Sequence, residues 1–210
     1  MHGRQIWIVD FGSQYTQLIT RKTRELGYSS GIFTVDQVRQ YLTDGKKPGA
    51  IILSGGPQSV FNDRNDYGLI FQDEKLPILG ICYGMQLMGK HFGGAVHKGH
   101  IGEYGNADIH MSNGFSIRNT PEKIKVWMSH SDHLVDIPGD FKVVMKSING
   151  FTAAIKHNNR PMMGLQFHPE VEHTNHGRDI LKYFLRDVAE LKEDWSPKKM
   201  LHEALEVVRS

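Results

Sequence analysis

The chain has 210 residues, of which 39% are hydrophobic, which is enough for the core of one domain of ordinary to large size. Its formal net charge is +2, and its basic and acidic residues are interspersed, a distribution that does not indicate a nucleic-acid-binding surface. No apolar run approaches the roughly 20 residues of a membrane span, and the first residues lead straight into a strand-like segment. We therefore expect no signal peptide, no membrane partner and a cytoplasmic location.

The first half of the chain alternates short apolar runs with helical patterns. Strands are expected at residues 6–9, 31–34, 50–54 and 77–81. Helices are expected at 15–26, from Thr34 onward, where Gln37 completes a capping box, and through 85–92. Near-continuous apolar strands that alternate with helices predict a parallel sheet covered on both faces.

After Gly93 and Gly94 the pattern changes to short strand-like segments separated by Gly, Asn and Pro turns. These segments lie around residues 95–97, 107–111, 126–129, 141–147, 151–156 and 162–167. A helix is expected from 177 to 191. The predicted fold class is therefore α/β, with a mixed, mainly parallel central sheet, flanking helices and a smaller antiparallel sheet. Residues 1–192 form the predicted domain, and residues 193–210 follow as an amphipathic helix.

Cys82 is the only cysteine, so it can form neither an internal disulfide nor a thiolate zinc site. It lies in Gly80-Ile-Cys-Tyr-Gly84, between an apolar strand and a helix, which is the pattern of a nucleophile elbow. Such a turn points the thiol outward, and the following helix start favours the thiolate and offers the N–H of Tyr83 to an oxyanion. The alternative is an inert cysteine buried in a glycine-rich turn.

His168 and Glu170 are the predicted partners of this thiol. In an extended chain they project to the same side, and Pro169 between them favours that conformation. Glu170 then holds one imidazole nitrogen and leaves the other to exchange a proton with Cys82. Alone, a His-Pro-Glu sequence is typical of a surface turn. It indicates a catalytic pair only because the same chain also contains the nucleophile elbow.

Ser54-Gly55-Gly56-Pro57 ends the third predicted strand, where loops of a doubly wound sheet gather around ligands. The N–H of Gly56 is accordingly a candidate second donor to an oxyanion. The alternative is an ordinary turn.

Together these residues resemble the class I, or triad, glutamine amidotransferase domains, over nearly the whole chain. The motifs occur in the order of that family: Asp10-Phe-Gly-Ser-Gln-Tyr-Thr-Gln17, Leu53-Ser-Gly-Gly-Pro57, Gly80-Ile-Cys-Tyr-Gly-Met-Gln86, Glu103-Tyr-Gly105, Trp127-Met-Ser-His-Ser-Asp132 and Gln166-Phe-His-Pro-Glu170. The first and fifth motifs are similar to the amidotransferase domains of GMP synthases in particular. Two positions depart from the family's usual residues, namely Gly102 and Ser131.

The resemblance implies a flavodoxin-like fold and a role for each of several residues. Cys82 would be the nucleophile, His168 the general base and acid, and Glu170 the residue that orients His168. Gly56 and Tyr83 would supply the oxyanion hole. The glutamine-binding residues would be Gln86, Ser129, His130 and Ser131.

The same resemblance implies that glutamine is hydrolysed to glutamate and ammonia through a cysteinyl thioester. The ammonia would pass to an ATP-pyrophosphatase domain that aminates xanthosine monophosphate, and ATP and Mg²⁺ would be used there and no cofactor here. The Ser-Gly-Gly-x-Asp-Ser loop of such a domain does not occur in this sequence. Alternatives are a glutaminase of another amidotransferase, a γ-glutamyl peptidase, or a non-catalytic module that retains the fold.

Twelve histidines raise the question of a metal site, and three pairs of them could each share a loop. None of these pairs has the thiolate or carboxylate neighbours of a closed zinc site, so we expect no functional metal. Two interpretations of Glu103 and Asp132 are considered: either they face a partner domain, or they are ordinary surface acids.

Overall fold

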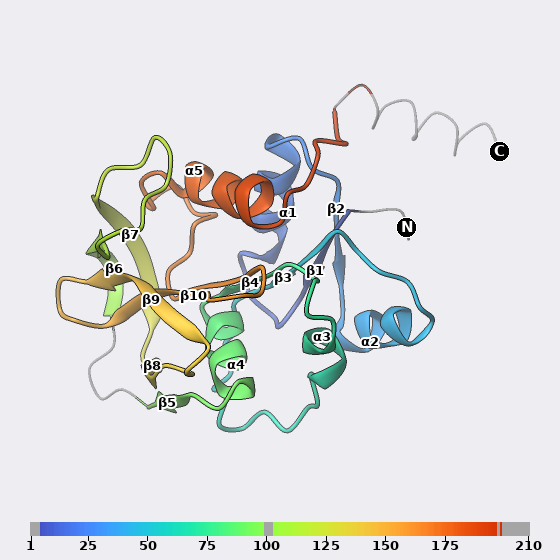
Figure 1. Cartoon of the computed structure of the whole chain (residues 1–210), viewed down its shortest axis with the longest axis horizontal. Helices are drawn as coiled ribbons and strands as arrows, with labels where there is room; N and C mark the ends of the chain where they lie inside the picture. The colour runs from blue at the N-terminus through green and yellow to red at the C-terminus, as the bar shows by residue number, and fades with distance from the viewer. Residues whose placement is uncertain (1–4, 99–102, 197, 199–210) are drawn as a thin grey trace.

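The computed structural model describes residues 5–98, 103–196 and 198, and within these ranges nine strands form one mixed sheet (Figure 1). The strand order is β2-β1-β3-β4-β11-β10-β9-β6-β7. The first five strands run parallel: β2 (Ser30–Phe33), β1 (Ile6–Val9), β3 (Ala50–Leu53), β4 (Ile78–Ile81) and β11 (Met162–Leu165). The remaining four are antiparallel: β10 (Thr152–His157), β9 (Phe141–Ser147), β6 (Glu103–Met111) and β7 (Lys123–His130).

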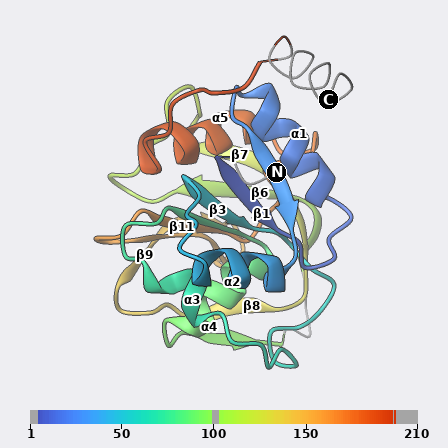
Figure 2. The ribbon, with the colours of Figure 1, turned by 90° about the vertical axis from the view of Figure 1, so that its right-hand side faces the viewer.

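The parallel half has the strand order of a flavodoxin-like sheet. Its inner strands β1, β3, β4 and β11 are completely buried, because helices cover both faces (Figure 2). On one face, Ile6, Ile8 and Ile52 pack with α1 (Thr16–Glu25) and α5 (Gly177–Lys182). On the other face, Trp7 and Ile51 pack with α2 (Val35–Thr43), α3 (Gly68–Gln72) and α4 (Tyr83–His91). Alternate residues of one strand thus enter two different cores, which explains the unbroken apolar runs.

The antiparallel half extends the same sheet. In β7 every second residue from Ile124 to His130 is buried, which is the pattern of a strand with one covered face. A separate pair, β5 (Ala95–His97) and β8 (His133–Asp136), forms the small antiparallel sheet. The predicted fold class is therefore confirmed, including the change from alternating strands and helices to mainly antiparallel strands after Gly94.

Several local predictions can be compared with the structure. The capping box of α2 is present, with Thr34 Oγ1 accepting from the Gln37 N–H and Gln37 Oε1 from the Thr34 N–H. The short helix α3 and the strand β8 were not predicted. The helix expected at 177–191 is α5 followed by a π-helical segment, η1 (Tyr183–Val188), and it ends at Val188.

The last described segment packs against the domain. The Asp194 carboxylate accepts hydrogen bonds from Ser29 N and Ser29 Oγ at 2.7 and 2.5 Å, and the guanidinium of Arg24 lies 5.0 Å from the centre of the Trp195 ring. The predicted amphipathic helix beyond this segment lies almost wholly outside the described residues. Among the described residues, none belongs to a helix with the length and apolar character needed to cross a membrane.

Candidate functional site

The site is a cavity of about 460 Å³ at the carboxyl ends of the parallel strands. Its walls come from the loops after β1, β3, β4 and β11, and from the end of β7. Cys82 and His168 both line it, together with Gly56 and the 129–132 segment. Carboxyl ends of neighbouring parallel strands meet at one edge, so residues far apart in sequence converge there.

Cys82 lies in a strained turn between β4 and α4. Its backbone has φ of +52° and ψ of −106°, a conformation that side chains with a Cβ rarely adopt. The two flanking glycines make the turn possible: a Cβ on Gly80 would lie 2.6 Å from the carbonyl carbon of Gly84, and one on Gly84 would lie 2.4 Å from the Leu53 oxygen. The Gly-x-Cys-x-Gly sequence is therefore required by the local packing.

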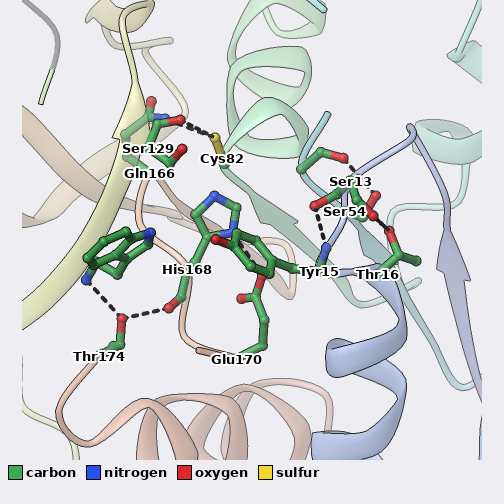
Figure 3. Close-up of polar contacts among 12 residues, drawn as sticks. Ser13, Tyr15, Thr16, Ser54, Cys82, Ser129, Gln166, His168, Glu170 and Thr174 are labelled. Atoms are coloured by element: carbon green, nitrogen blue, oxygen red, sulfur yellow. Dashed lines mark hydrogen bonds and ion pairs between the residues drawn. The ribbon is translucent and has the colours of Figure 1, made fainter. Parts of the chain in front are cut away.

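Cys82 is only 6% exposed, and its thiol points toward Ser129 and Gln166 (Figure 3). Its Sγ lies 4.0 Å from the Ser129 carbonyl oxygen and 3.8 Å from Gln166 Nε2. The first turn of α4 begins directly after it, so the Tyr83 N–H, for which no backbone acceptor is found among the described residues, and the positive end of the helix dipole lie next to Cys82.

His168 lies between this thiol and Glu170 (Figure 3). Its Nδ1 donates to Glu170 Oε1 at 2.8 Å, and both side chains are buried. A Cβ placed on Gly55 would lie 3.0 Å from His168 Cε1 and 3.7 Å from Cys82 Cβ, so the imidazole and the cysteine face the same glycine. Because Nδ1 is committed to Glu170, Nε2 is the nitrogen left for Cys82.

The backbone of His168 is held from two sides, in the loop beyond β11. Its N–H donates to the Trp127 oxygen at 3.1 Å, and its carbonyl oxygen accepts from Thr174 Oγ1 at 2.6 Å. Thr174 Oγ1 also accepts from the Trp127 N–H at 3.0 Å, which joins this loop to the edge strand β7. The ring of Tyr15 meets the imidazole edge-on, with ring centres 5.1 Å apart. The imidazole is thus fixed in position as well as in orientation.

The charge state of His168 follows from its neighbours. Burial by itself would lower the pKa of the imidazole, but the hydrogen bond with Cys82 and the hydrogen bond and negative charge of Glu170 outweigh it. The pKa of His168 is therefore raised to about 10. At neutral pH the imidazole of His168 is therefore protonated.

Gly56 and Tyr83, the two residues predicted to supply oxyanion donors, are neighbours in the structure. Tyr83 is the first residue of α4, so no helical carbonyl precedes it to accept its N–H. A Cβ placed on Gly56 would lie 3.5 Å from Tyr83 Cγ, which puts the glycine against the base of the tyrosine ring. Ser54 fixes this loop to the loop after β1, because its Oγ accepts from the Phe11 N–H at 3.1 Å.

The four predicted glutamine-binding residues all line the cavity, but they differ in what they offer. Gln86 is buried, and its Nε2 donates to the Asp132 oxygen at 2.8 Å and to Gln166 Oε1 at 3.3 Å. Its amide thus braces the cavity wall. Ser129 and Ser131 line the cavity as well, and the Ser129 carbonyl oxygen lies 4.0 Å from Cys82 Sγ.

His130 is buried and uncharged. Burial lowers the pKa of its imidazole to about 4. Its Nδ1 lies 3.0 Å from the Asp132 oxygen, to which it donates, and its Nε2 has no hydrogen-bond partner within the described part of the chain. A neutral, buried ring is therefore part of the cavity wall.

Glu103 and Asp132 are not surface acids, so that alternative is wrong. Each is only 8% exposed. Glu103 Oε1 accepts from Asn149 Nδ2 at 3.0 Å, and Asp132 Oδ2 accepts from Ser59 Oγ at 2.5 Å. Pairing across β6 and β7 and the turn after β7 bring both acids inside, which single-sequence reading could not show.

Sequence reasoning missed the contributions of Tyr15 and Gln166 to this site. Both belong to motifs that were recognised, but their side chains meet His168 and Cys82 only through the packing of separate loops. No group of three or more His, Cys, Asp or Glu side chains suited to a metal ion is found among the described residues.

Comparison with known proteins agrees with this geometry. The family model described as glutamine amidotransferase class-I matches residues 7–188. The chain is 41% identical to the glutamine-hydrolysing GMP synthase of Chlorobium phaeobacteroides, over 99% of this chain and 42% of that protein. It is 40% identical to the corresponding enzyme of Staphylococcus saprophyticus, over 98% of this chain and 40% of that protein. The chain thus spans about two fifths of the length of these relatives.

Solved structures show the same architecture. A protein from Thermoplasma acidophilum, described as a candidate GMP synthase subunit, superposes with a TM-score of 0.77 and 32% identity, over 88% of this chain and 93% of that one. A glutamine amidotransferase from Thermotoga maritima, at 22% identity and a TM-score of 0.60, shares the fold, over 90% of this chain and 85% of that one. Because the family match spans every loop that builds the cavity, this chain belongs to the class-I glutamine amidotransferase family.

Proposed function

We propose that this chain hydrolyses the side-chain amide of glutamine to glutamate and ammonia, with Cys82 as nucleophile. The observation that carries the proposal is the position of the His168 imidazole, which Glu170 holds at 2.8 Å and which faces the same glycine, Gly55, as Cys82 at its strained elbow. A thiol, a base and an orienting carboxylate in that order constitute an activated nucleophile. Family membership supports the same reaction.

The reaction begins with the imidazolium–thiolate pair. The thiolate of Cys82 attacks the carboxamide carbon, and the carbonyl oxygen becomes an oxyanion held by the N–H groups of Gly56 and Tyr83. His168 then gives its Nε2 proton to the nitrogen as the C–N bond breaks. Ammonia leaves, and a γ-glutamyl thioester remains on Cys82.

The second half restores the enzyme. Neutral His168 takes a proton from water as the water oxygen attacks the thioester, again through an oxyanion at the same two N–H groups. Collapse of this intermediate expels the Cys82 thiolate and releases glutamate, which leaves His168 protonated. Glu170 keeps Nδ1 occupied throughout, so the proton moves only on Nε2. The net reaction is glutamine plus water to glutamate plus ammonia.

Recognition of glutamine falls to the end of β7 and the turn after it. In this proposal the backbone of Ser129 and Ser131 contacts the amino-acid end of glutamine, and the buried His130 between them fixes this segment through its hydrogen bond to the Asp132 oxygen. Gln86 acts indirectly, because its amide fixes the Asp132 carbonyl to which His130 donates. No cofactor enters any of these steps.

We further infer that the ammonia serves GMP synthesis. The relatives that match at about 40% identity are glutamine-hydrolysing GMP synthases, and this chain corresponds to about two fifths of their length. The partner in this proposal is an ATP-pyrophosphatase domain, which uses ATP and Mg²⁺ to activate xanthosine monophosphate for amination. The proposed setting is the cytoplasm.

Covalent labelling tests the nucleophile directly. An electrophilic glutamine analogue is expected to add to the chain in a one-to-one ratio, and intact-mass measurement reads the product. Cys82 is the only cysteine, so Cys82→Ala removes every thiol and is a complete control. Labelling that persists in that variant, or no glutamate release by the wild type, would contradict the proposed function.

A further inference from the structure

The loop at residues 55–67, between β3 and α3, carries Gly56, and three side-chain hydrogen bonds join it to other segments within the described residues. Ser59 Oγ donates to Asp132 Oδ2 at 2.5 Å, and Lys90 Nζ donates to the Val60 oxygen at 2.6 Å. The third tie is Asp63, which accepts a hydrogen bond from the hydroxyl of Tyr83.

The Asp63 tie differs from the others because Tyr83 is also an oxyanion donor. Asp63 Oδ2 accepts from both Tyr83 Oη and Tyr67 Oη, the latter at 2.5 Å. Its Oδ1 accepts from Asn65 N and Asn65 Nδ2, each at 2.9 Å. One carboxylate therefore joins the loop that bears the first donor to the side chain of the second.

Electrostatics agree with a charged carboxylate in this cluster. Desolvation raises the pKa of Asp63, but hydrogen bonds from Tyr67, Tyr83 and Asn65 outweigh it, so the pKa lies below its usual value. Burial and the nearby carboxylate raise the pKa of Tyr67 to about 12 and that of Tyr83 further. Both hydroxyls thus remain donors and Asp63 remains an acceptor over the working pH range.

The side chain of Tyr83, to which Asp63 is bonded, is itself held in a fixed position. Its side chain is 3% exposed, and its ring packs on Phe11 with centres 5.1 Å apart. The turn beneath it is fixed by the Cys82 N–H, which donates to the Leu165 oxygen at 2.7 Å, and by the Gly84 N–H, which donates to the Ser54 oxygen at 3.2 Å. Gly56 has no side chain through which it could be held in this way, so the position of its N–H depends on the loop that carries it.

We propose that Asp63 is a positioning residue for glutamine hydrolysis: through the Tyr83 hydroxyl it fixes the Gly56 N–H relative to the Tyr83 N–H. This inference rests on the proposed function, since it concerns the oxyanion of that reaction. An oxyanion hole depends on the placement of its donors, and a shift of one donor weakens the transition state more than the ground state.

The other two ties predict different effects. Ser59 and Asp132 both line the cavity, so loss of that bond acts on glutamine binding. Lys90 is in the last turn of α4 and reaches Val60, away from both donors. Only the Asp63 tie is expected to change the rate of the chemical step with little change in substrate binding.

The test compares Asp63→Ala, Tyr83→Phe and the double variant by steady-state glutamate release. Each single variant is expected to lose about tenfold or more in kcat, while KM for glutamine changes less than about twofold. The kcat of the double variant is expected to be no lower than that of the less active single variant, because both substitutions remove the same link. Tyr83→Phe deletes one oxygen atom, so it tests the link even where Asp63→Ala lowers stability.

Two controls separate positioning from damage. Tyr67→Phe removes the other hydroxyl on the same carboxylate oxygen, and a kcat loss below about threefold is expected because Tyr67 carries no oxyanion donor. Alkylation of Cys82 by iodoacetamide forms no carbonyl oxyanion, so its rate is expected to be unchanged in Asp63→Ala and Tyr83→Phe.

The outcomes distinguish the two claims. A wild-type chain that hydrolyses glutamine while both single variants keep its kcat would overturn the positioning role and leave the proposed function intact. Additive losses, losses confined to KM, or losses that parallel the alkylation rate would also overturn it. Absence of glutaminase activity in the wild type would instead contradict the proposed function.

Discussion

His168 and Glu170 are joined by a 2.8 Å hydrogen bond across a single proline, with both side chains buried. The bond forms in a loop that two hydrogen bonds to its backbone fix against β7. It determines which imidazole nitrogen faces Cys82, so the orientation of the base is set before any substrate arrives.

Replacing Glu170 by glutamine is expected to lower kcat by about a hundredfold or more, because a neutral amide neither holds the Nδ1 proton as firmly nor stabilises the imidazolium. Glu172→Gln changes an exposed acid of the same loop and provides the matched control. Glutamate release under saturating glutamine measures both. Equal rates in the two variants would refute the orienting role.

The raised pKa of His168 predicts a pH dependence of stability. The unfolded imidazole has a pKa of about 6.5 and the folded one about 10, so the folded state binds the proton more tightly. The stabilisation is fully present below about pH 6.5 and is lost as the pH rises through about 10. Urea unfolding across that range is expected to show a steeper loss for the wild type than for His168→Gln. Parallel curves would contradict the prediction.

His130 is expected to remain neutral, with its proton on Nδ1, down to about pH 5, because its pKa is lowered to about 4. Nitrogen-15 spectra of histidine-labelled protein distinguish the tautomers, and His130→Asn identifies the resonance. An imidazolium signal for His130 near neutral pH would show that the ring is not in the buried, uncharged state described here.

Gly84→Ala is expected to destabilise the fold by roughly 2–4 kcal/mol, because the new Cβ would lie 2.4 Å from the Leu53 oxygen and no flexible side chain can yield there. Gly139→Ala is the control, since its Cβ would meet nothing within 4 Å. Denaturant unfolding compares the two. A Gly84→Ala variant as stable as the control would mean that the elbow tolerates a side chain.

Coupling to a synthetase partner can be tested by titration. The chain alone is expected to release ammonia slowly, and the rate is expected to rise when the synthetase part of a GMP synthase and its nucleotide are added. A shift of one oxyanion donor is enough for such control, since one donor changes the rate by about a hundredfold or more. Rates that do not respond to the partner would refute the coupling.

The sequence by itself determined the alternation of strands and helices in the first half, because each buried strand is an unbroken apolar run and each helix has its own cap or period. It also determined the elbow, since Gly80 and Gly84 flank Cys82 for reasons of close packing that are local to the strand–turn–helix unit. The assignment of His168 and Glu170 as partners likewise came from two residues of one motif.

Tertiary structure alone decided which groups surround those residues. The burial of Glu103 and Asp132, the contact of Tyr15 with His168, and the tie from Asp63 to Tyr83 all join segments that are distant in sequence. Local propensity carries no information on such contacts, because they depend on strand order and on how the loops pack at one edge of the sheet. The strained turn of Cys82 is thus predictable from its own sequence, whereas the burial and charge of the groups around it are set by the fold.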